Sequence, residues 1–302
     1  MDIIKIQNFS KTLKSEFKFN YKIKKLNWFN IGGNTEVFFK PDNLKDLLLF
    51  LKNFGKNEKI FVLGAGSNIL FNDKKFEGII IKLGKNFSNI SLLPNNVIVA
   101  GSATTDKKLA DFAMENSIGG LEFLSCIPGT VGGGLKINSG CFGREFKDIL
   151  LSIQAIDTQG NIQTIHSKDI KFEYRNNNLS EDLIFLSASF RGIKGNFTEI
   201  KDKTEKLKVE KEKNQPTKIK TSGSTFKNPI TQTEKKVWQL IKESVSLDKS
   251  FGDACISEKH CNFFVNKGNA KFDDMKKLID FVAKNVLEKT GISLEKEIKI
   301  LE

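Results

Sequence analysis

Short apolar runs alternate with amphipathic stretches over the first two thirds of the chain, which is the pattern of a mixed α and β protein. Runs rich in Ile, Val and Phe have the length and the β-branched content of strands. The strands predicted in this way cover residues 59–63, 78–83, 97–101, 149–156, 162–166 and 183–190. Leucines three or four positions apart predict a helix over residues 44–51 with Asp42 as its N-cap, and a second helix through Leu109, Phe112 and Ala113.

The pattern changes near residue 197. Residues 198–214 have the composition of a charged helix that stops before Pro216. Beyond it, amphipathic helices are predicted over residues 237–244 and 272–286, and strands over residues 262–266 and 297–301. We therefore expect an α+β protein with a first domain of residues 1–197, divided into two subdomains near residue 85, and a second domain of residues 198–302.

Composition and charge exclude several classes of protein. The chain is 39% hydrophobic and 28% charged, which is ordinary for a folded domain and argues against disorder, collagen or a coiled coil. The net charge is +12, but only three of the 48 basic residues are arginines. Because recognition of bases and phosphates prefers Arg, we expect no nucleic-acid partner. A Lys-rich nucleic-acid-binding protein stays as an alternative, although the chain shows no recognition helix or zinc module.

The cysteines and the N-terminus indicate the compartment. None of the four cysteines forms a C-x-x-C pair, and Cys255, His260 and Cys261 lack the paired spacing of a four-ligand zinc site. We therefore expect free thiols, no metal and a structural role for His260. The first twenty residues contain no signal-peptide core, and no apolar stretch is long enough to span a bilayer. A cytoplasmic location without membrane insertion is expected.

Glycine is concentrated in two loops, where it lets the backbone approach a ligand closely. Eight of the 23 glycines fall within residues 119–143, in a stretch that reads Pro-Gly-Thr-Val-Gly-Gly-Gly from Pro128. A second loop, Gly-Ala-Gly-Ser-Asn at residues 64–68, follows a predicted strand but has Ile69 at the third glycine position of a dinucleotide fingerprint. Neither loop is a P-loop. Each suits phosphate without belonging to a common nucleotide-binding fold.

Seven short motifs follow one another along almost the whole chain. They occupy residues 30–33 (Asn-Ile-Gly-Gly), 64–68 (Gly-Ala-Gly-Ser-Asn), 127–133 (Ile-Pro-Gly-Thr-Val-Gly-Gly), 174–175 (Tyr-Arg), 223–229 (Gly-Ser-Thr-Phe-Lys-Asn-Pro), 257–260 (Ser-Glu-Lys-His) and 294–297 (Leu-Glu-Lys-Glu). In this order they resemble the UDP-N-acetylenolpyruvoylglucosamine reductase (MurB) family. The resemblance implies a vanillyl-alcohol-oxidase-type (PCMH-like) FAD-binding module of two subdomains, followed by a C-terminal α/β substrate-binding domain.

The resemblance also implies the reaction and its cofactors. A bacterial enzyme of this kind reduces UDP-N-acetylglucosamine enolpyruvate to UDP-N-acetylmuramate for peptidoglycan synthesis, with FAD as cofactor and NADPH as co-substrate. The two glycine loops would hold the FAD pyrophosphate, and we expect a monomer. A flavin oxidoreductase of the same fold with another substrate is the alternative, because the glycine loops fit it equally. The implied FAD-binding residues are Gly64, Gly66, Ser67, Asn68, Gly129, Thr130, Gly132 and Gly133.

The resemblance assigns roles to five residues of the proposed site. Reduction of an enol ether places negative charge beside a carboxylate, so the site needs a fixed positive or hydrogen-bonding group and a proton donor. Ser224 resembles the serine that protonates the enolate carbon, and Arg175 resembles the arginine that stabilises the enolate. Glu297 resembles the glutamate that assists. Lys227 and Asn228 look like substrate contacts.

Two parts of the pattern stay open or depart from the family. Strand alternation would place Glu295 and Glu297 on one face, so spacing does not choose between them, and only the family pattern favours Glu297. Lys299 stands where the family usually has Arg. The only tyrosines are Tyr21 and Tyr174, so the chain resembles the variety of the family without a tyrosine-bearing loop, and no residue is assigned to clamp the substrate diphosphate.

Overall fold

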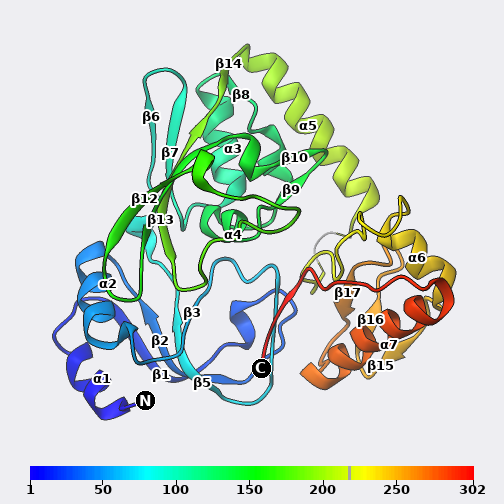
Figure 1. Cartoon of the computed structure of the whole chain (residues 1–302), viewed down its shortest axis with the longest axis horizontal. Coiled ribbons are helices and arrows are strands. Elements are labelled where there is room, and N and C mark those ends of the chain that lie inside the picture. The colour runs from blue at the N-terminus through cyan, green and yellow to red at the C-terminus, as the bar shows by residue number, and fades with distance from the viewer. Residues whose placement is uncertain (217–218) are drawn as a thin grey trace. The chain divides into compact units, whose positions relative to one another are not determined.

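The chain folds into two compact units (Figure 1), which we describe separately. The computed structural model describes residues 1–216 and 219–302. The units do not divide at residue 197, because the boundary falls inside helix α5 (Phe197–Asn214) and two segments from the first part of the chain, carrying Phe29 and Leu70, enter the core of the second unit. The first unit contains Met1–Asn20, Glu36–Ala65 and Glu77–Glu210, and the second contains Tyr21–Thr35, Gly66–Phe76 and Lys211–Glu302.

A four-stranded sheet covered by two helices forms one part of the first unit. Strands β3 (Ile60–Val62) and β5 (Phe76–Ile81) of this sheet are parallel, with Val62 opposite Ile81. Helix α2 begins after Asn43, whose Oδ1 accepts a hydrogen bond from the Asp46 N–H at 2.9 Å, so the prediction of Asp42 as the cap is wrong by one residue. The elements are α1 (Ile3–Ser10), β1 (Glu16–Lys22), β2 (Asn34–Lys40), α2 (Leu44–Phe50) with a π-helical extension (Leu51–Gly55), β3 (Ile60–Val62) and β5 (Phe76–Ile81), with sheet order β1-β2-β5-β3.

A five-stranded antiparallel sheet forms the other part of the first unit. Helices α3 (Asp106–Glu115) and α4 (Val131–Lys136) pack against it through a core that includes Leu109, Leu135 and Phe190. The strands are β6 (Ile90–Leu93), β7 (Val97–Gly101), β11 (Leu150–Ile156), β12 (Ile162–His166) and β13 (Ile184–Arg191), in the order β12-β11-β13-β7-β6. All six strands predicted for the first domain are present, with end points shifted by two residues at most.

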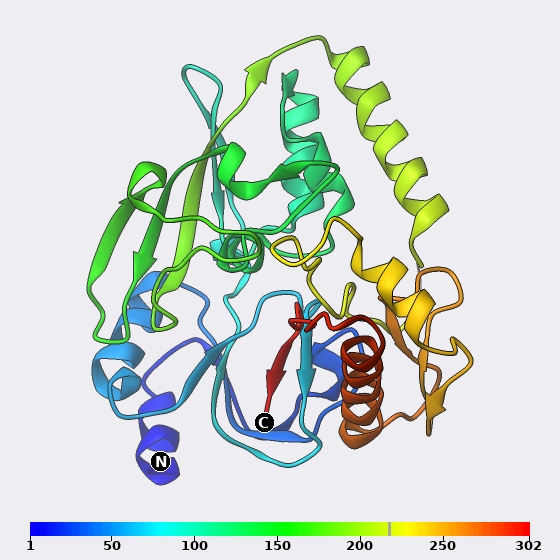
Figure 2. The ribbon, with the colours of Figure 1, turned by 45° about the vertical axis from the view of Figure 1, so that its right-hand side comes forward.

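In the part of the chain that the structure describes, the second unit is built around two α-helices and two small sheets. Helices α6 (Val237–Ser244) and α7 (Phe272–Thr290) bury their apolar faces around Phe264 of β17, and α7 ends at Gly291, which has a left-handed φ of +72°. Figure 2 shows the C-terminal strand β18 (Lys299–Leu301) beside the parallel strand β4 (Ile69–Phe71). Strand β18 begins later than the predicted strand over residues 297–301. The three antiparallel strands are β15 (Ser250–Phe251), β16 (Ala254–Ile256) and β17 (Phe264–Asn266).

Among residues 1–216 and 219–302, no helix is both long and apolar enough to cross a membrane.

Short elements complete the fold. The small strand pairs are β8 (Ile118–Gly119) with β14 (Ile193–Lys194) and β9 (Gly140–Cys141) with β10 (Arg144–Glu145). The 3₁₀ helices are Lys24–Leu26, Lys85–Phe87, Glu122–Cys126, Phe146–Asp148 and Ser167–Asp169.

Candidate functional site

The two glycine-rich segments meet inside the first unit. Gly64 follows β3, and a β-carbon added to Gly64 would lie 2.5 Å from the Thr130 Oγ1 and 3.9 Å from the Cα of Gly133. Thr130 is the residue before α4, and Gly133 lies in that helix. The structure therefore brings together Gly64, Thr130 and Gly133, three of the residues predicted to bind FAD.

Part of the second glycine-rich segment is a helix and not an open loop. The N–H groups of Val131 and Gly132 donate to the carbonyl oxygens of Thr104 and Ser102, at 2.9 and 3.0 Å, so these two groups are used inside the protein. The tight space also explains the glycine at position 132, because a β-carbon there would lie 3.0 Å from the Cβ of Ser102. The expected open loop is thus wrong beyond Thr130, and packing accounts for Gly132.

Three buried polar residues stand behind the start of α4. The hydroxyls of Ser102 and Thr104 and both carboxyl oxygens of Asp106 have no hydrogen-bond partner among the residues that the structure describes. A β-carbon on Gly129 would lie 2.6 Å from Asp106 Oδ2, so the carboxyl lies against this glycine. Complete burial raises the pKa of Asp106 well above its usual range, which favours the neutral acid. Unsatisfied donors beside Gly129 fit a site for a polar group such as a diphosphate.

Lys82 lies beside the first glycine loop and was missed by the sequence analysis. It follows β5 directly, and its Nζ donates a hydrogen bond to the Gly64 carbonyl. Burial, followed by the nearby charge of Lys40, lowers the pKa of Lys82. The sequence did contain a signal for Lys82. If the predicted strands over residues 59–63 and 78–83 are parallel, their carboxyl ends meet at one edge of the sheet, and Lys82 lies near the end of the second strand.

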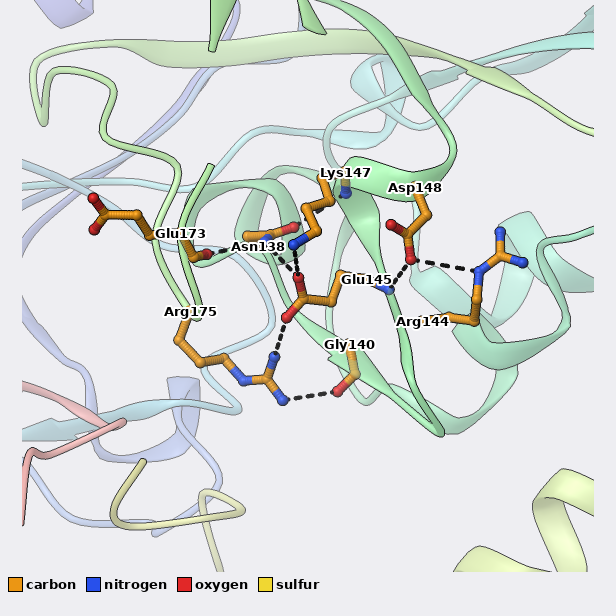
Figure 3. Close-up of polar contacts among 8 residues, drawn as sticks. All are labelled: Asn138, Gly140, Arg144, Glu145, Lys147, Asp148, Glu173 and Arg175. Atoms are coloured by element: carbon orange, nitrogen blue, oxygen red, sulfur yellow. Dashed lines mark hydrogen bonds and ion pairs between the residues drawn. The ribbon is translucent and has the colours of Figure 1, made fainter. Parts of the chain in front are cut away.

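Arg175 belongs to the first unit, and its guanidinium is held by Gly140 and Glu145 of the same unit (Figure 3). Its Nη1 lies 3.2 Å from Glu145 Oε1, and its Nη2 donates to the Gly140 carbonyl at 3.0 Å. Glu145 was not singled out in the sequence, because an acidic residue in a glycine-rich stretch gives no local pattern. The arginine predicted to stabilise the enolate therefore has a fixed orientation.

Ser224 and Glu297 lie on neighbouring segments of the second unit. Ser224 pairs with Phe263 as an isolated bridge, and the Thr225 N–H donates to the Asn262 carbonyl at 2.8 Å. On the other side, the Glu297 N–H donates to the Thr225 carbonyl at 2.8 Å. Backbone hydrogen bonds on both sides of Thr225 therefore fix the segment that carries Ser224 next to the one that carries Glu297.

The two C-terminal glutamates have different surroundings. The chain is not a strand at either residue, so the expected alternation does not apply. Glu295 is exposed and pairs with Lys227, with Nζ and Oε1 2.5 Å apart. Glu297 is half-buried, and its carbonyl accepts a hydrogen bond from Asn68 Nδ2 at 3.0 Å. The contact with Lys227 distinguishes Glu295 from Glu297, which their spacing in the sequence could not do.

The remaining predicted site residues of the second unit also have structural contacts. Asn228 Oδ1 accepts a hydrogen bond from the Val237 N–H at 3.0 Å, which holds the first turn of α6. Gly66 has a φ of +70°, and a β-carbon there would collide with the Leu26 carbonyl. Ser67 and Asn68 are half-buried and precede β4. Their roles toward substrate and FAD stay predictions.

His260 has structural contacts within the second unit. The His260 Nδ1 accepts a hydrogen bond from the Asn262 N–H at 3.3 Å, and its ring lies edge-on to Phe263 with centroids 4.8 Å apart. Burial lowers the pKa of His260. The side chain thus supports the turn before β17. None of the four cysteines forms a disulfide in the part of the chain that the structure describes.

Two family models match separate parts of the chain. Residues 35–166 match the FAD binding domain family, and residues 215–301 match the family of the C-terminal domain of UDP-N-acetylenolpyruvoylglucosamine reductase. A solved berberine bridge enzyme variant, described as a reticuline dehydrogenase, aligns with a TM-score of 0.50 over 65% of this chain and 44% of that chain, at 16% identity. That similarity concerns the fold alone. The predicted α+β fold with a vanillyl-alcohol-oxidase-type module is confirmed.

Two proteins are similar over the whole length. The crystal structure of UDP-N-acetylenolpyruvylglucosamine reductase (MurB) from Thermus caldophilus has a TM-score of 0.81 and 26% identity, covering 96% of this chain and 99% of that chain. The UDP-N-acetylenolpyruvoylglucosamine reductase of Pelagibacter ubique (strain HTCC1062) is 66% identical over 302 residues, which is 100% of both chains. Identity at this level along the full length means that the chain belongs to the UDP-N-acetylenolpyruvoylglucosamine reductase family.

Proposed function

We propose that this chain catalyses the FAD-dependent, NADPH-using reduction of UDP-N-acetylglucosamine enolpyruvate to UDP-N-acetylmuramate. The observation that carries the proposal is the 66% identity with the Pelagibacter ubique reductase over the full length of both chains. The FAD binding domain match over residues 35–166 supports the cofactor. A monomer located in the cytoplasm stays our prediction from the sequence.

The meeting point of the glycine-rich segments fits the diphosphate of FAD. Gly64 and Gly133 present backbone without side chains beside the Thr130 hydroxyl, and Lys82 brings a positive charge to the same loop. We assign Gly64, Thr130, Gly133 and Lys82 to the diphosphate. Asp106 lies behind Gly129, and because burial raises its pKa, its carboxyl opposes a diphosphate less than an ordinary carboxylate would. Bound FAD supplies the hydride for the terminal carbon of the substrate.

Side chains of the protein stabilise the negative charge of the enolate and donate the proton that its carbon receives. Arg175 stabilises the negative charge that develops beside the substrate carboxylate, since a guanidinium matches that geometry. Ser224 gives its hydroxyl proton to the adjacent carbon, and Glu297 assists. The family pattern favours Glu297 for this role, and Glu295 lies exposed at the surface beside Lys227. Lys227 and Asn228 are proposed as substrate contacts.

Consumption of NADPH by the purified, FAD-loaded protein tests the proposal. We expect consumption that depends on UDP-N-acetylglucosamine enolpyruvate. A yellow protein that binds FAD but shows no dependence on this substrate would point to a flavin oxidoreductase with another substrate. A protein that does not bind FAD would contradict the assignment of the glycine-rich segments as well.

A further inference from the structure

Arg175 sits in a backbone conformation that an arginine rarely adopts. It is the second central residue of a tight turn in which Glu173 and Asn176 exchange two backbone hydrogen bonds of 2.9 and 3.2 Å. Its φ is +58°, in the left-handed region, which is sterically strained for a residue with a Cβ. A non-glycine residue in this conformation is kept when its surroundings determine it, and such residues cluster at functional sites.

The surroundings fix the guanidinium from three directions. Glu145 Oε1 lies 3.2 Å from Nη1, the Gly140 carbonyl accepts a hydrogen bond from Nη2 at 3.0 Å, and the ring of Tyr174 lies 4.8 Å from the guanidinium carbon. The side chains of Arg175 and Glu145 are only 15% and 16% exposed. An ion pair buried to this degree has a more defined geometry than a pair at the surface.

Asn138 holds Glu145 and the arginine turn together (Figure 3). Its Nδ2 donates to Glu145 Oε2 at 3.0 Å and to the Glu173 carbonyl at 3.1 Å, while its Oδ1 accepts from the Lys147 N–H at 3.1 Å. Asn138 is completely buried and has a φ of +43°. The Asn138 side chain thus links the Glu145 carboxylate, which contacts the guanidinium, to the turn that contains Arg175.

Glu145 is shared between two cations. Lys147 Nζ lies 2.9 Å from Glu145 Oε2, while Arg175 Nη1 lies 3.2 Å from Glu145 Oε1. Each carboxylate oxygen therefore has its own cationic partner, which fixes the carboxylate that orients the guanidinium.

We propose that Glu145, anchored by Asn138, is the positioning residue for Arg175 and sets the direction in which the guanidinium meets the substrate. The inference rests on the proposed function, in which Arg175 stabilises the enolate. Glu145 itself does not touch the reacting atoms in this proposal, and its effect passes through Arg175.

The test compares the two half-reactions of the FAD-loaded Glu145→Gln variant by rapid mixing. We expect flavin reduction by NADPH at the wild-type rate, and reoxidation by UDP-N-acetylglucosamine enolpyruvate slowed about 10- to 100-fold, as for a misplaced catalytic group. Glu145→Asp, which keeps the charge but withdraws it from Arg175, should be slowed as well. The matched control is Glu122→Gln, a buried glutamate of the same unit paired with Lys203. It should reoxidise normally.

A double-mutant cycle separates positioning from a general structural effect. If Glu145 acts through Arg175, Glu145→Gln should add little to the defect of Arg175→Lys. Wild-type reoxidation in both Glu145 variants, or fully additive losses in the cycle, would overturn the inference while leaving the proposed function intact. Substrate-independent NADPH consumption in the wild-type protein would instead contradict the proposed function.

Discussion

Gly64 and Thr130 lie so close that a β-carbon on the glycine would stand 2.5 Å from the threonine hydroxyl oxygen. Gly64→Ala should therefore force one of the two glycine-rich segments to shift. We expect a loss of about 1–3 kcal/mol in the free energy of unfolding, the usual cost of overpacking, together with weaker FAD binding. Urea unfolding and an FAD titration measure the two effects.

A second substitution tests whether Thr130 is the cause of that loss. Thr130→Ala removes the oxygen that the new methyl group would meet. In the Gly64→Ala background it should restore part of the lost stability, whereas in the wild-type background it should not stabilise the protein. Additive losses in the double variant would show that the contact between these residues is not what limits position 64.

Unlike Gly64, Gly133 could carry a side chain without a collision inside the protein. A β-carbon at Gly133 would stay 3.5 Å from Thr130 Oγ1, an ordinary contact, and the residue lies within helix α4. Gly133→Ala should leave the stability unchanged or raise it by up to about 1 kcal/mol. If FAD approaches this backbone, the same variant should bind FAD at least about 10-fold more weakly, by roughly 1.4 kcal/mol. Unchanged FAD affinity would remove Gly133 from the cofactor site.

Lys82 should tie the binding of FAD to pH. Because burial lowers its pKa, Lys82 loses its proton at a lower pH than an ordinary lysine, and FAD affinity should fall as the pH rises through that value. Lys82→Met should bind FAD about 10-fold more weakly at neutral pH, the equivalent of roughly 1.4 kcal/mol, and should lose this part of the pH dependence. Lys85→Met, an exposed lysine three residues further on, is the control. Identical pH profiles for wild type and Lys82→Met would contradict the assignment.

Ser224→Ala separates the two halves of the proposed reaction. Flavin reduction by NADPH should be unchanged, while reoxidation by the enolpyruvyl substrate should slow by about 100-fold or more, as expected when a proton donor is removed. Rapid mixing followed by flavin absorbance measures both steps. Ser246→Ala, an exposed serine of the same unit, serves as the control. Wild-type rates in both steps would exclude Ser224 as the proton donor.

Hydrophobic periodicity predicted most elements because each strand or helix buries one apolar face. It failed at α4, where Gly132, Gly133 and Gly134 oppose a helix by propensity. Packing decides there, since a side chain at Gly134 would collide with the ring of Phe146. The unit boundary also escaped prediction, because it depends on which core a residue enters and not on local composition.

The site was predictable to the extent that its chemistry follows from short motifs. Ser224 and Glu297 came from the family pattern, and the structure brings their segments together through Thr225. Lys82 could have been predicted, because parallel pairing of the two strands places it beside the first glycine loop. Glu145 was not, because its contact with Arg175 joins residues 30 positions apart through a turn with a positive φ that no sequence rule indicates.

Asp106 should make the stability of the protein fall with rising pH. Burial raises its pKa in the folded state above the ordinary value of 3.8, so the folded protein keeps a proton that the unfolded chain has lost. The associated stability is complete below the unfolded pKa and is lost as the pH rises toward the folded pKa, by up to about 1.4 kcal/mol per pH unit.

Asp106→Asn tests this linkage, because the amide has nearly the same shape and binds no proton. The free energy of unfolding of the FAD-free variant, measured with urea from mildly acidic to neutral pH, should depend less on pH than that of the wild type. Thr104→Val removes an uncharged buried hydroxyl two residues before Asp106. It should change the stability without changing the pH dependence of the stability. Equal slopes for wild type and Asp106→Asn would mean that Asp106 is ionised in the fold. A negative charge would then stand behind Gly129, where it would oppose a diphosphate.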